Sequence, residues 1–123
     1  MPNLNIPFYD LKSINSKYIE SFSDSLKRVL ESGIHMIGQE TEAFENSFAK
    51  YCGTKYCVGV GNGLDALILS LRSYIELGFM NEGDEVIVPA NTYIATILAI
   101  TESRLKPVLI EPDIKTYNIT HKA

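Results

Sequence analysis

Short apolar runs alternate with helical patterns in the second half of the chain, and this alternation limits the possible folds more than any other feature. The apolar runs occupy residues 55–60, 85–88 and 106–110. Strands that alternate with helices form parallel sheets with right-handed crossovers. Parallel strands are covered on both faces, so they read as continuous apolar runs such as "EVIV". The sequence therefore predicts a β-α-β-α-β unit with a parallel sheet.

Two helices are expected between these strands. The first carries an apolar stripe of period 3.6 from Leu64 to Ile75 and stops at Gly78. The second spans residues 92–103, where many side chains are β-branched. Its length and its position between two strands favour a helix over the local propensity for a strand.

An extended arm and two helices are expected before the first strand. The arm spans residues 5–11 and contains a proline. Gly33 and Gly53 suit the left-handed ends of the two helices, the second of which spans residues 39–51. The first helix carries a stripe that is expected to lie in the core. The stripe consists of Tyr18, Phe22, Leu26 and Leu30.

Composition narrows the class of protein. The chain has 123 residues, enough for one domain, and its 46% hydrophobic content supports a packed core. A net charge of −4 argues against nucleic-acid binding. No signal peptide and no apolar run of membrane-spanning length is found, so we expect neither a membrane partner nor secretion. Cys52 and Cys57 match no metal motif, and we expect buried thiols in a reducing cytoplasm and no metal site.

A glycine-bearing turn links the first strand to the next helix. It reads Gly61-Asn62-Gly63-Leu64-Asp65. The unpaired N–H groups and the positive dipole at such a helix start favour an anion, with the amides of Leu64 and Asp65 as donors. A carboxylate at Asp65 also suits helix capping. A turn without any ligand remains the alternative.

The turn does not match the common nucleotide-binding motifs. The third glycine of a dinucleotide fingerprint is missing, and the strand at residues 85–88 is not followed by an acidic residue that would hold a ribose. No Gly-Lys-[Ser/Thr] follows either, which argues against a P-loop.

The second strand end carries an aromatic residue. Pro89 closes the strand and Tyr93 lies at the start of the next helix. Ligands of open α/β sheets bind at such carboxyl ends. A tyrosine there can lie flat against a planar heterocycle. The residues alone favour core packing for Tyr93, and both interpretations stay open.

The motifs in combination resemble the DegT/DnrJ/EryC1/StrS family of pyridoxal-phosphate-dependent aminotransferases, which act on nucleotide-linked sugars. They are "GVGNGLDAL", "GDEVIVPANTYIAT" and "PVLIEPDIKTYNI", preceded by "IPFYDLK" and "SGIHMIGQETEAFENSFAKYCGTKYCVGV". The resemblance covers nearly the whole chain. It implies a single partial domain, the N-terminal part of the large domain of a fold-type I transferase. Residues 1–53 would be the arm and two helices, and residues 54–123 the start of the cofactor-binding sheet.

The resemblance also implies roles for residues at the two strand ends. Gly63, Leu64 and Asp65 match the turn that holds the phosphate of pyridoxal 5'-phosphate. Family members often carry a hydroxyl residue where Leu64 stands, so the backbone amides must contribute more here. Tyr93 matches the aromatic that stacks on the pyridine ring, which reverses the preference for core packing.

Substrate contacts are implied nearer the N-terminus. Phe8, Tyr9 and Asp10 lie in the arm that shapes the sugar-nucleotide end of the family's site, and His35 lies in a loop near it. The alternatives are a docked extended segment and a surface histidine.

The resemblance implies an enzyme, but no catalytic residue in this chain. The family's Schiff-base lysine and the carboxylate that pairs with the pyridine nitrogen are expected downstream, so this chain alone should lack turnover. The intact protein would be a cytoplasmic homodimer that moves an amino group from an amino acid, expected to be glutamate, to a keto-sugar nucleotide. Transaminases of dTDP-linked 3-keto-6-deoxyhexoses are the most similar. The alternatives are a non-catalytic phosphate- or nucleotide-binding module and an inactive fragment.

Overall fold

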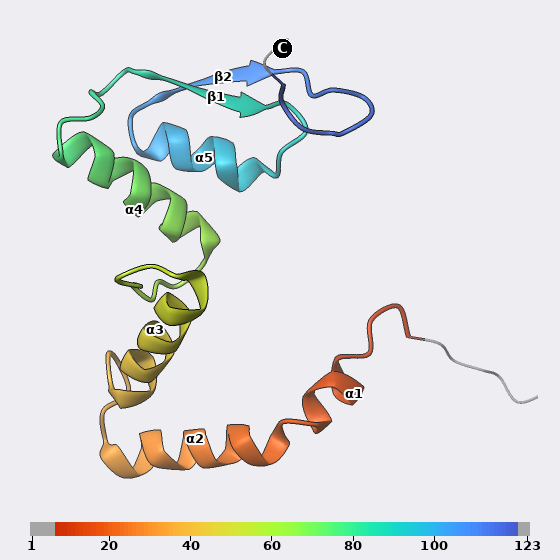
Figure 1. Ribbon diagram of the computed structural model, residues 1–123, viewed down its shortest axis with the longest axis vertical. Coiled ribbons are helices and arrows are strands. Elements are labelled where there is room, and N and C mark those ends of the chain that lie inside the picture. The colour runs from red at the N-terminus through yellow and green to blue at the C-terminus, as the bar shows by residue number, and fades with distance from the viewer. Residues whose placement is uncertain (1–6, 121–123) are drawn as a thin grey trace, which may run out of the picture. The chain divides into compact units, whose positions relative to one another are not determined.

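The computed structural model describes residues 7–120. Contacts within the chain divide it into two compact units, of which the first ends at Gly59 and the second begins at Val60. The elements, labelled in Figure 1, are α1 (Leu11–Ser16), α2 (Ile19–Ser32), α3 (Gln39–Cys52), α4 (Gly63–Glu76), β1 (Glu85–Pro89), α5 (Ile94–Glu102) and β2 (Lys106–Ile110).

The first unit contains three helices with well-defined ends. Asp10 caps α1, since its carboxylate accepts a hydrogen bond from the Ser13 N–H at 3.0 Å. Gly33 ends α2 with a φ of 69° and Gly53 ends α3 with a φ of 70°. Both glycines therefore occupy the left-handed conformation that their sequence positions predict. The helix α1 was not predicted, and it begins at Leu11, the last residue of the expected arm. The first two residues of that arm lie outside the described part of the chain.

The apolar stripe of α2 is not a core in this structure, so that prediction is wrong here. Its four side chains are between 54% and 61% exposed, and α2 has no buried residue. A hydrophobic stripe identifies the face that a helix can bury, but it does not identify what covers that face. The contact between α2 and α3 that the structure does show is an ion pair in which Arg28 Nε donates to Glu40 Oε1 at 2.5 Å.

The second unit is a small α/β layer structure. Its sheet has two parallel strands, β1 and β2, paired from Glu85 with Lys106 to Pro89 with Ile110. The helix α5 connects them and packs against both strands and against α4. Figure 1 shows both helices on one side of the sheet.

The core of the second unit forms where α5 meets the sheet. Val88, Ile100 and Leu105 are at most 4% exposed and contact one another. Burying an aliphatic side chain of this size stabilises the folded state by about 1.5–3 kcal/mol. Leu71, Ile75, Met80, Val86 and Ile97 pack around this cluster. The apolar patterns of α4, β1 and α5 therefore correspond to one common core.

The predicted strand at residues 55–60 is wrong, because the sheet of the described residues has two strands and not three. A strand exists only when a neighbour accepts and donates its backbone hydrogen bonds. Here the Gly59 N–H instead donates to the Glu45 carboxylate at 2.6 Å, and the Thr54 hydroxyl donates to the Tyr56 carbonyl at 3.1 Å. The segment is apolar enough for a strand but has no partner in residues 7–120.

Smaller differences concern one helix start and the two cysteines. The helix α5 begins two residues later than predicted, because the Thr92 N–H donates to the Pro89 carbonyl in a turn and Tyr93 is extended. Cys52 is exposed and Cys57 is half-buried, so the expectation of buried thiols is also wrong. The bounds of α4, β1 and β2 agree with the predictions to within one or two residues.

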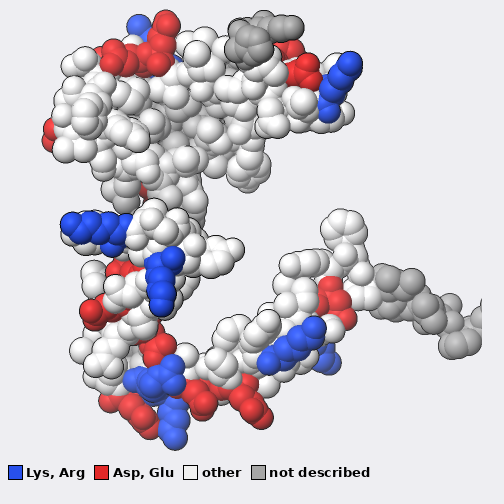
Figure 2. Space-filling view, viewed as in Figure 1, with Lys and Arg blue, Asp and Glu red and all other residues white. Residues whose placement is uncertain are grey.

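Charged side chains of both signs are interspersed along the first unit on the face shown in Figure 2. Three ion pairs join side chains of opposite charge in the described residues, and all six side chains are at least 36% exposed. None of the helices in residues 7–120 is long and apolar enough to cross a membrane.

Candidate functional site

The glycine-bearing turn before α4 and the segment that follows β1, both indicated by the sequence, meet at one cavity of about 620 Å³, which we call the N-end cavity. It lies at the N-terminal ends of α4 and α5 in the second unit. No charged side chain lines it. Its lining residues are Asn62, Gly63, Leu64, Leu67, Tyr93, Ile94, Ala95, Thr96 and Leu98. Residues about 30 positions apart in the sequence therefore line one cavity.

Asn62 organises the start of α4. It is the N-cap residue, and its Oδ1 accepts a hydrogen bond from the Asp65 N–H at 3.0 Å. The Ala66 N–H donates to the Asn62 carbonyl at 3.1 Å. Among the hydrogen bonds of residues 7–120, none uses the N–H of Gly63 or Leu64. The sequence predicts Leu64 and Asp65 as the anion donors, whereas the free pair is Gly63 and Leu64.

The Asp65 carboxylate is held by the residues that precede the helix. Asn62 Nδ2 donates to Asp65 Oδ2 at 3.0 Å, which makes the pair reciprocal. A Cβ atom on Gly61 would lie 2.9 Å from the same oxygen, so a side chain at position 61 would displace this carboxylate. Gly61 and Asn62 belong to the turn that the sequence indicates, but neither is among the predicted cofactor-binding residues. An asparagine three residues before an aspartate at the start of an apolar helix resembles a capping box, and this spacing is the signal that could have identified Asn62.

Tyr93 presents its ring at the N-end cavity. It is 79% exposed, and it is the N-cap residue of α5 with an extended backbone. The Thr96 N–H donates to the Tyr93 carbonyl at 3.0 Å, and the Thr92 hydroxyl donates to that of Thr96 at 3.0 Å. These bonds fix the turn that carries the ring. The ring is not packed in the core of the second unit, so its face is open to a planar ligand.

The residues of the N-end cavity fit pyridoxal 5'-phosphate in two respects. Two free N–H groups at the positive end of α4 suit a phosphate dianion. The exposed ring of Tyr93 and the aliphatic side chains of Leu64 and Ile94 suit the pyridine ring. No lysine lines the cavity, so it offers no amine for a covalent bond to an aldehyde.

The four candidate substrate residues all belong to the first unit. Phe8 is fully exposed and Tyr9 is 66% exposed. Asp10 uses its carboxylate as the cap of α1. His35 is exposed and lines a small cavity of about 50 Å³ together with Arg28 and other residues of the α2–α3 connection. Their contact with a substrate stays a prediction.

Two carboxyl groups have shifted pKa values with clear causes. The hydrogen bond from Arg28 lowers the pKa of Glu40, and Glu40 raises the pKa of Arg28 in turn. The backbone N–H groups of Thr116 and Lys115 donate to Asp113 at 3.0 and 2.9 Å and lower its pKa. None of these groups lies at the N-end cavity.

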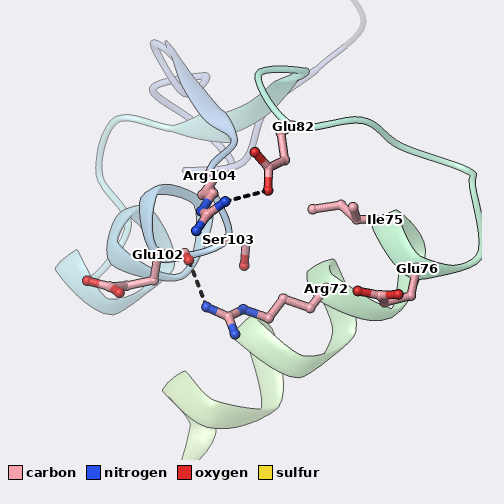
Figure 3. Close-up of a pocket in the computed structure, with 7 residues that line it drawn as sticks. All are labelled: Arg72, Ile75, Glu76, Glu82, Glu102, Ser103 and Arg104. Carbon is pink, nitrogen blue, oxygen red and sulfur yellow. Dashed lines mark hydrogen bonds and ion pairs between the residues drawn. The ribbon is translucent and has the colours of Figure 1, made fainter.

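A second cavity of about 250 Å³, the C-end cavity, lies at the opposite ends of α4 and α5. Its lining residues are Arg72, Ile75, Glu76, Glu82, Glu102, Ser103 and Arg104. Figure 3 shows Arg72 reaching the Glu102 carbonyl, at 3.2 Å, and Arg104 reaching the Glu82 carboxylate, at 2.9 Å. The mixture of guanidinium and carboxylate groups favours no single ligand charge. No cluster of residues suited to a metal ion occurs in the described part of the chain.

Comparison with known proteins identifies related sequences. Residues 17–123 match the model of the DegT/DnrJ/EryC1/StrS aminotransferase family. The chain is 57% identical over 114 residues to dTDP-3-amino-3,6-dideoxy-alpha-D-galactopyranose transaminase of Aneurinibacillus thermoaerophilus. That match covers 93% of this chain and 30% of the relative.

Solved structures show the same fold. DesV of S. venezuelae, crystallised in complex with a ketimine intermediate, superposes with a TM-score of 0.79 at 45% identity, over 88% of this chain and 28% of that one. E. coli GDP-4-keto-6-deoxy-D-mannose-3-dehydratase with bound hydrated PLP gives a TM-score of 0.70 at 29% identity, over 95% and 28%. The fold is thus that of the N-terminal part of fold-type I aminotransferase structures, and the chain spans about 30% of the length of these relatives.

Proposed function

The chain belongs to the DegT/DnrJ/EryC1/StrS aminotransferase family, and we propose that it forms the N-terminal portion of a pyridoxal-phosphate-dependent aminotransferase for a nucleotide-linked deoxysugar. The intact enzyme would transfer an amino group from an amino acid, with glutamate as the expected donor, to the ketone of the sugar. The relative that is 57% identical favours a dTDP-linked 3-keto-6-deoxyhexose as substrate. One observation carries the proposal: the free amides of Gly63 and Leu64 and the ring of Tyr93 meet at one cavity.

This chain's residues would bind and orient the cofactor. Gly63 and Leu64 would donate their N–H groups to the phosphate, and the dipole of α4 would stabilise its charge. Tyr93 would lie against one face of the pyridine ring and hold it in place. When bound, pyridoxal phosphate supplies an electron sink for the carbon that gains or loses the amino group. Phe8, Tyr9, Asp10 and His35 are proposed to contact the sugar nucleotide.

We propose that the remaining catalytic groups belong to the rest of the intact enzyme and not to this chain. The amine that bonds to the cofactor and the carboxylate that pairs with the ring nitrogen would come from the rest of the intact enzyme. We propose that the intact enzyme is a cytoplasmic homodimer. The 123 residues alone should therefore bind cofactor weakly and turn over no substrate.

The test is a comparison of the intact protein with this chain. Each is purified, loaded with pyridoxal phosphate and incubated with glutamate and a dTDP-3-keto-6-deoxyhexose, and the products are identified by mass spectrometry. We expect the intact protein to form the amino sugar and 2-oxoglutarate, and this chain to form neither. A dehydrated sugar as the product, or no product from the intact protein, contradicts the proposal.

A non-catalytic nucleotide-binding module is the alternative function. Titrations with pyridoxal phosphate and with NAD, followed by absorbance and fluorescence, distinguish the two. Selective binding of NAD would favour the module, because the cavity would then accept a dinucleotide and not a phosphorylated pyridine. The absence of charged residues in the cavity lining argues against a ribose-binding carboxylate there.

A further inference from the structure

An acidic residue next to a proposed phosphate site requires an explanation. Asp65 lies in the first turn of α4, one residue after the free amides of Gly63 and Leu64. A carboxylate close to a bound phosphate would repel it, and the repulsion is strong where little water screens the charges. The position of the Asp65 carboxylate therefore decides whether this helix start accepts an anion.

The structure ties the Asp65 carboxylate to Asn62 and Gly61. Asn62 Nδ2 donates to Asp65 Oδ2 at 3.0 Å, and the same oxygen occupies the space where a Gly61 side chain would lie. Asn62 Oδ1 also accepts from the Asp65 N–H at 3.0 Å. One side chain therefore holds both the backbone N–H and the carboxylate of Asp65. Asn62 lines the N-end cavity together with Gly63 and Leu64, whereas Asp65 does not.

We propose that Asn62 is a positioning residue for the cofactor phosphate. Its side-chain Nδ2 donates to the Asp65 carboxylate and holds it out of the N-end cavity, and its side-chain Oδ1 accepts from the Asp65 N–H, so that the N–H groups of Gly63 and Leu64 are left as the phosphate donors. Gly61 provides the room that the carboxylate needs. This inference rests on the proposed function, because it assigns the phosphate to the same cavity.

Helix capping alone does not explain the two hydrogen bonds between Asn62 and Asp65. Aspartate and asparagine cap helices about equally well, so Asn62→Asp keeps the acceptor for the Asp65 N–H. The same substitution removes the amide donor and sets two carboxylates against each other. If Asn62 serves only as a cap, Asn62→Asp acts on the phosphate only through its own new charge, and exchanging the two residues of the pair would not restore binding. If Asn62 positions the carboxylate, Asn62→Asp weakens phosphate binding.

The experiment measures dissociation constants on the intact protein for pyridoxal phosphate and for pyridoxal, which lacks the phosphate. We expect Asn62→Asp to raise the constant for pyridoxal phosphate about tenfold and to leave that for pyridoxal unchanged. The repulsion between the two carboxylates should also lower the melting temperature of the cofactor-free protein, so the comparison with pyridoxal separates the phosphate from general destabilisation. Equal affinities of the variant and the wild type for pyridoxal phosphate, or an equal loss for pyridoxal, would overturn the inference.

Two matched variants complete the test. Asp65→Asn removes the charge and should bind pyridoxal phosphate at least as tightly as the wild type. Asn62→Asp combined with Asp65→Asn exchanges the two partners, restores their hydrogen bond and should return the affinity to near the wild-type value. Failure of the exchange to restore binding, or weaker binding by Asp65→Asn alone, contradicts the positioning role. If the wild type itself binds no pyridoxal phosphate, the proposed function fails and this inference with it; if only the variants fail to differ, the proposed function stands.

Discussion

The backbone N–H of Gly83 donates to the carbonyl of Arg104 at 2.8 Å and ties the segment before β1 to the segment before β2. Arg104 lies in the left-handed region with a φ of 60°. Its N–H donates to the Thr101 carbonyl at 2.9 Å, so both of its backbone groups are bonded. The surrounding structure therefore imposes a conformation on Arg104 that L-residues avoid.

Arg104→Gly should stabilise the protein by about 1 kcal/mol, because glycine adopts the left-handed region without strain. The substitution also removes the ion pair with Glu82, whose side chains are 75% and 58% exposed. An ion pair as exposed as this contributes about 0–1 kcal/mol. The free energy of unfolding from urea titration measures the change. Arg104→Ala is the control, since it loses the same ion pair and keeps the strain; a gain from alanine as large as that from glycine would contradict the explanation.

Ser103→Ala should also stabilise the protein. The residue is 3% exposed, and its hydroxyl has no hydrogen-bond partner among residues 7–120. A buried hydroxyl without a partner costs about 1–3 kcal/mol, so its removal should raise the free energy of unfolding by about 1 kcal/mol. Ser73→Ala is the matched control, because the Ser73 hydroxyl donates to the Leu69 carbonyl on an exposed helix face and its loss should change little. A loss of stability in Ser103→Ala would show that the hydroxyl is satisfied.

The sequence was sufficient to predict the elements whose stabilising contacts lie within the second unit. Side chains of β1, α4 and α5 form or pack against the cluster of Val88, Ile100 and Leu105, and the last of these immediately precedes β2. Local pattern and tertiary burial agree there, so the element bounds were predictable from either. The same holds for the ends of α2 and α3, which glycines fix locally.

Features that depend on which other segment packs or pairs with them were not predictable. Residues 55–60 have the composition of a strand, but a strand requires another strand beside it and none is present in the described residues. The α2 stripe has the period of a buried face but nothing covers it here. At the site, the motifs indicated Gly63, Leu64, Asp65 and Tyr93. The hydrogen bonds of Asn62 to Asp65, which occupy the Asp65 N–H, depend on side-chain orientations that a motif does not specify.

Asp113 should titrate below the ordinary value of about 3.8, because the N–H groups of Thr116 and Lys115 stabilise its charged form. A pKa that folding lowers stabilises the folded turn above the ordinary pKa of aspartate, and this contribution is lost as the pH falls through the lowered value. NMR titration of the Thr116 and Lys115 amide shifts gives the midpoint. Asp113→Asn should abolish the titration. A midpoint at or above the ordinary value would show that these hydrogen bonds are not formed.

Tyr93→Ala should weaken pyridoxal phosphate binding to the intact protein about tenfold, since it removes the ring that we propose lies against the cofactor. Tyr93→Phe keeps the ring and should bind within about threefold of the wild type. The side chain is 79% exposed, so neither substitution should lower the melting temperature of the cofactor-free protein. Fluorescence titration measures both constants. Equal binding by the alanine variant would remove Tyr93 from the proposed site.

Leu64→Thr should strengthen phosphate binding. Leu64 lines the N-end cavity at the second position of α4, where a threonine hydroxyl adds a donor beside the free N–H of the same residue. A hydrogen bond to a charged group contributes about 1.5–3 kcal/mol, which corresponds to a gain in affinity of roughly tenfold or more. Leu64→Val is the control, because valine has nearly the shape of threonine and lacks the hydroxyl. A gain for threonine and none for valine, measured by titration of the intact protein with pyridoxal phosphate, is the expected outcome. The same affinity for both variants would place the phosphate elsewhere than at the start of α4.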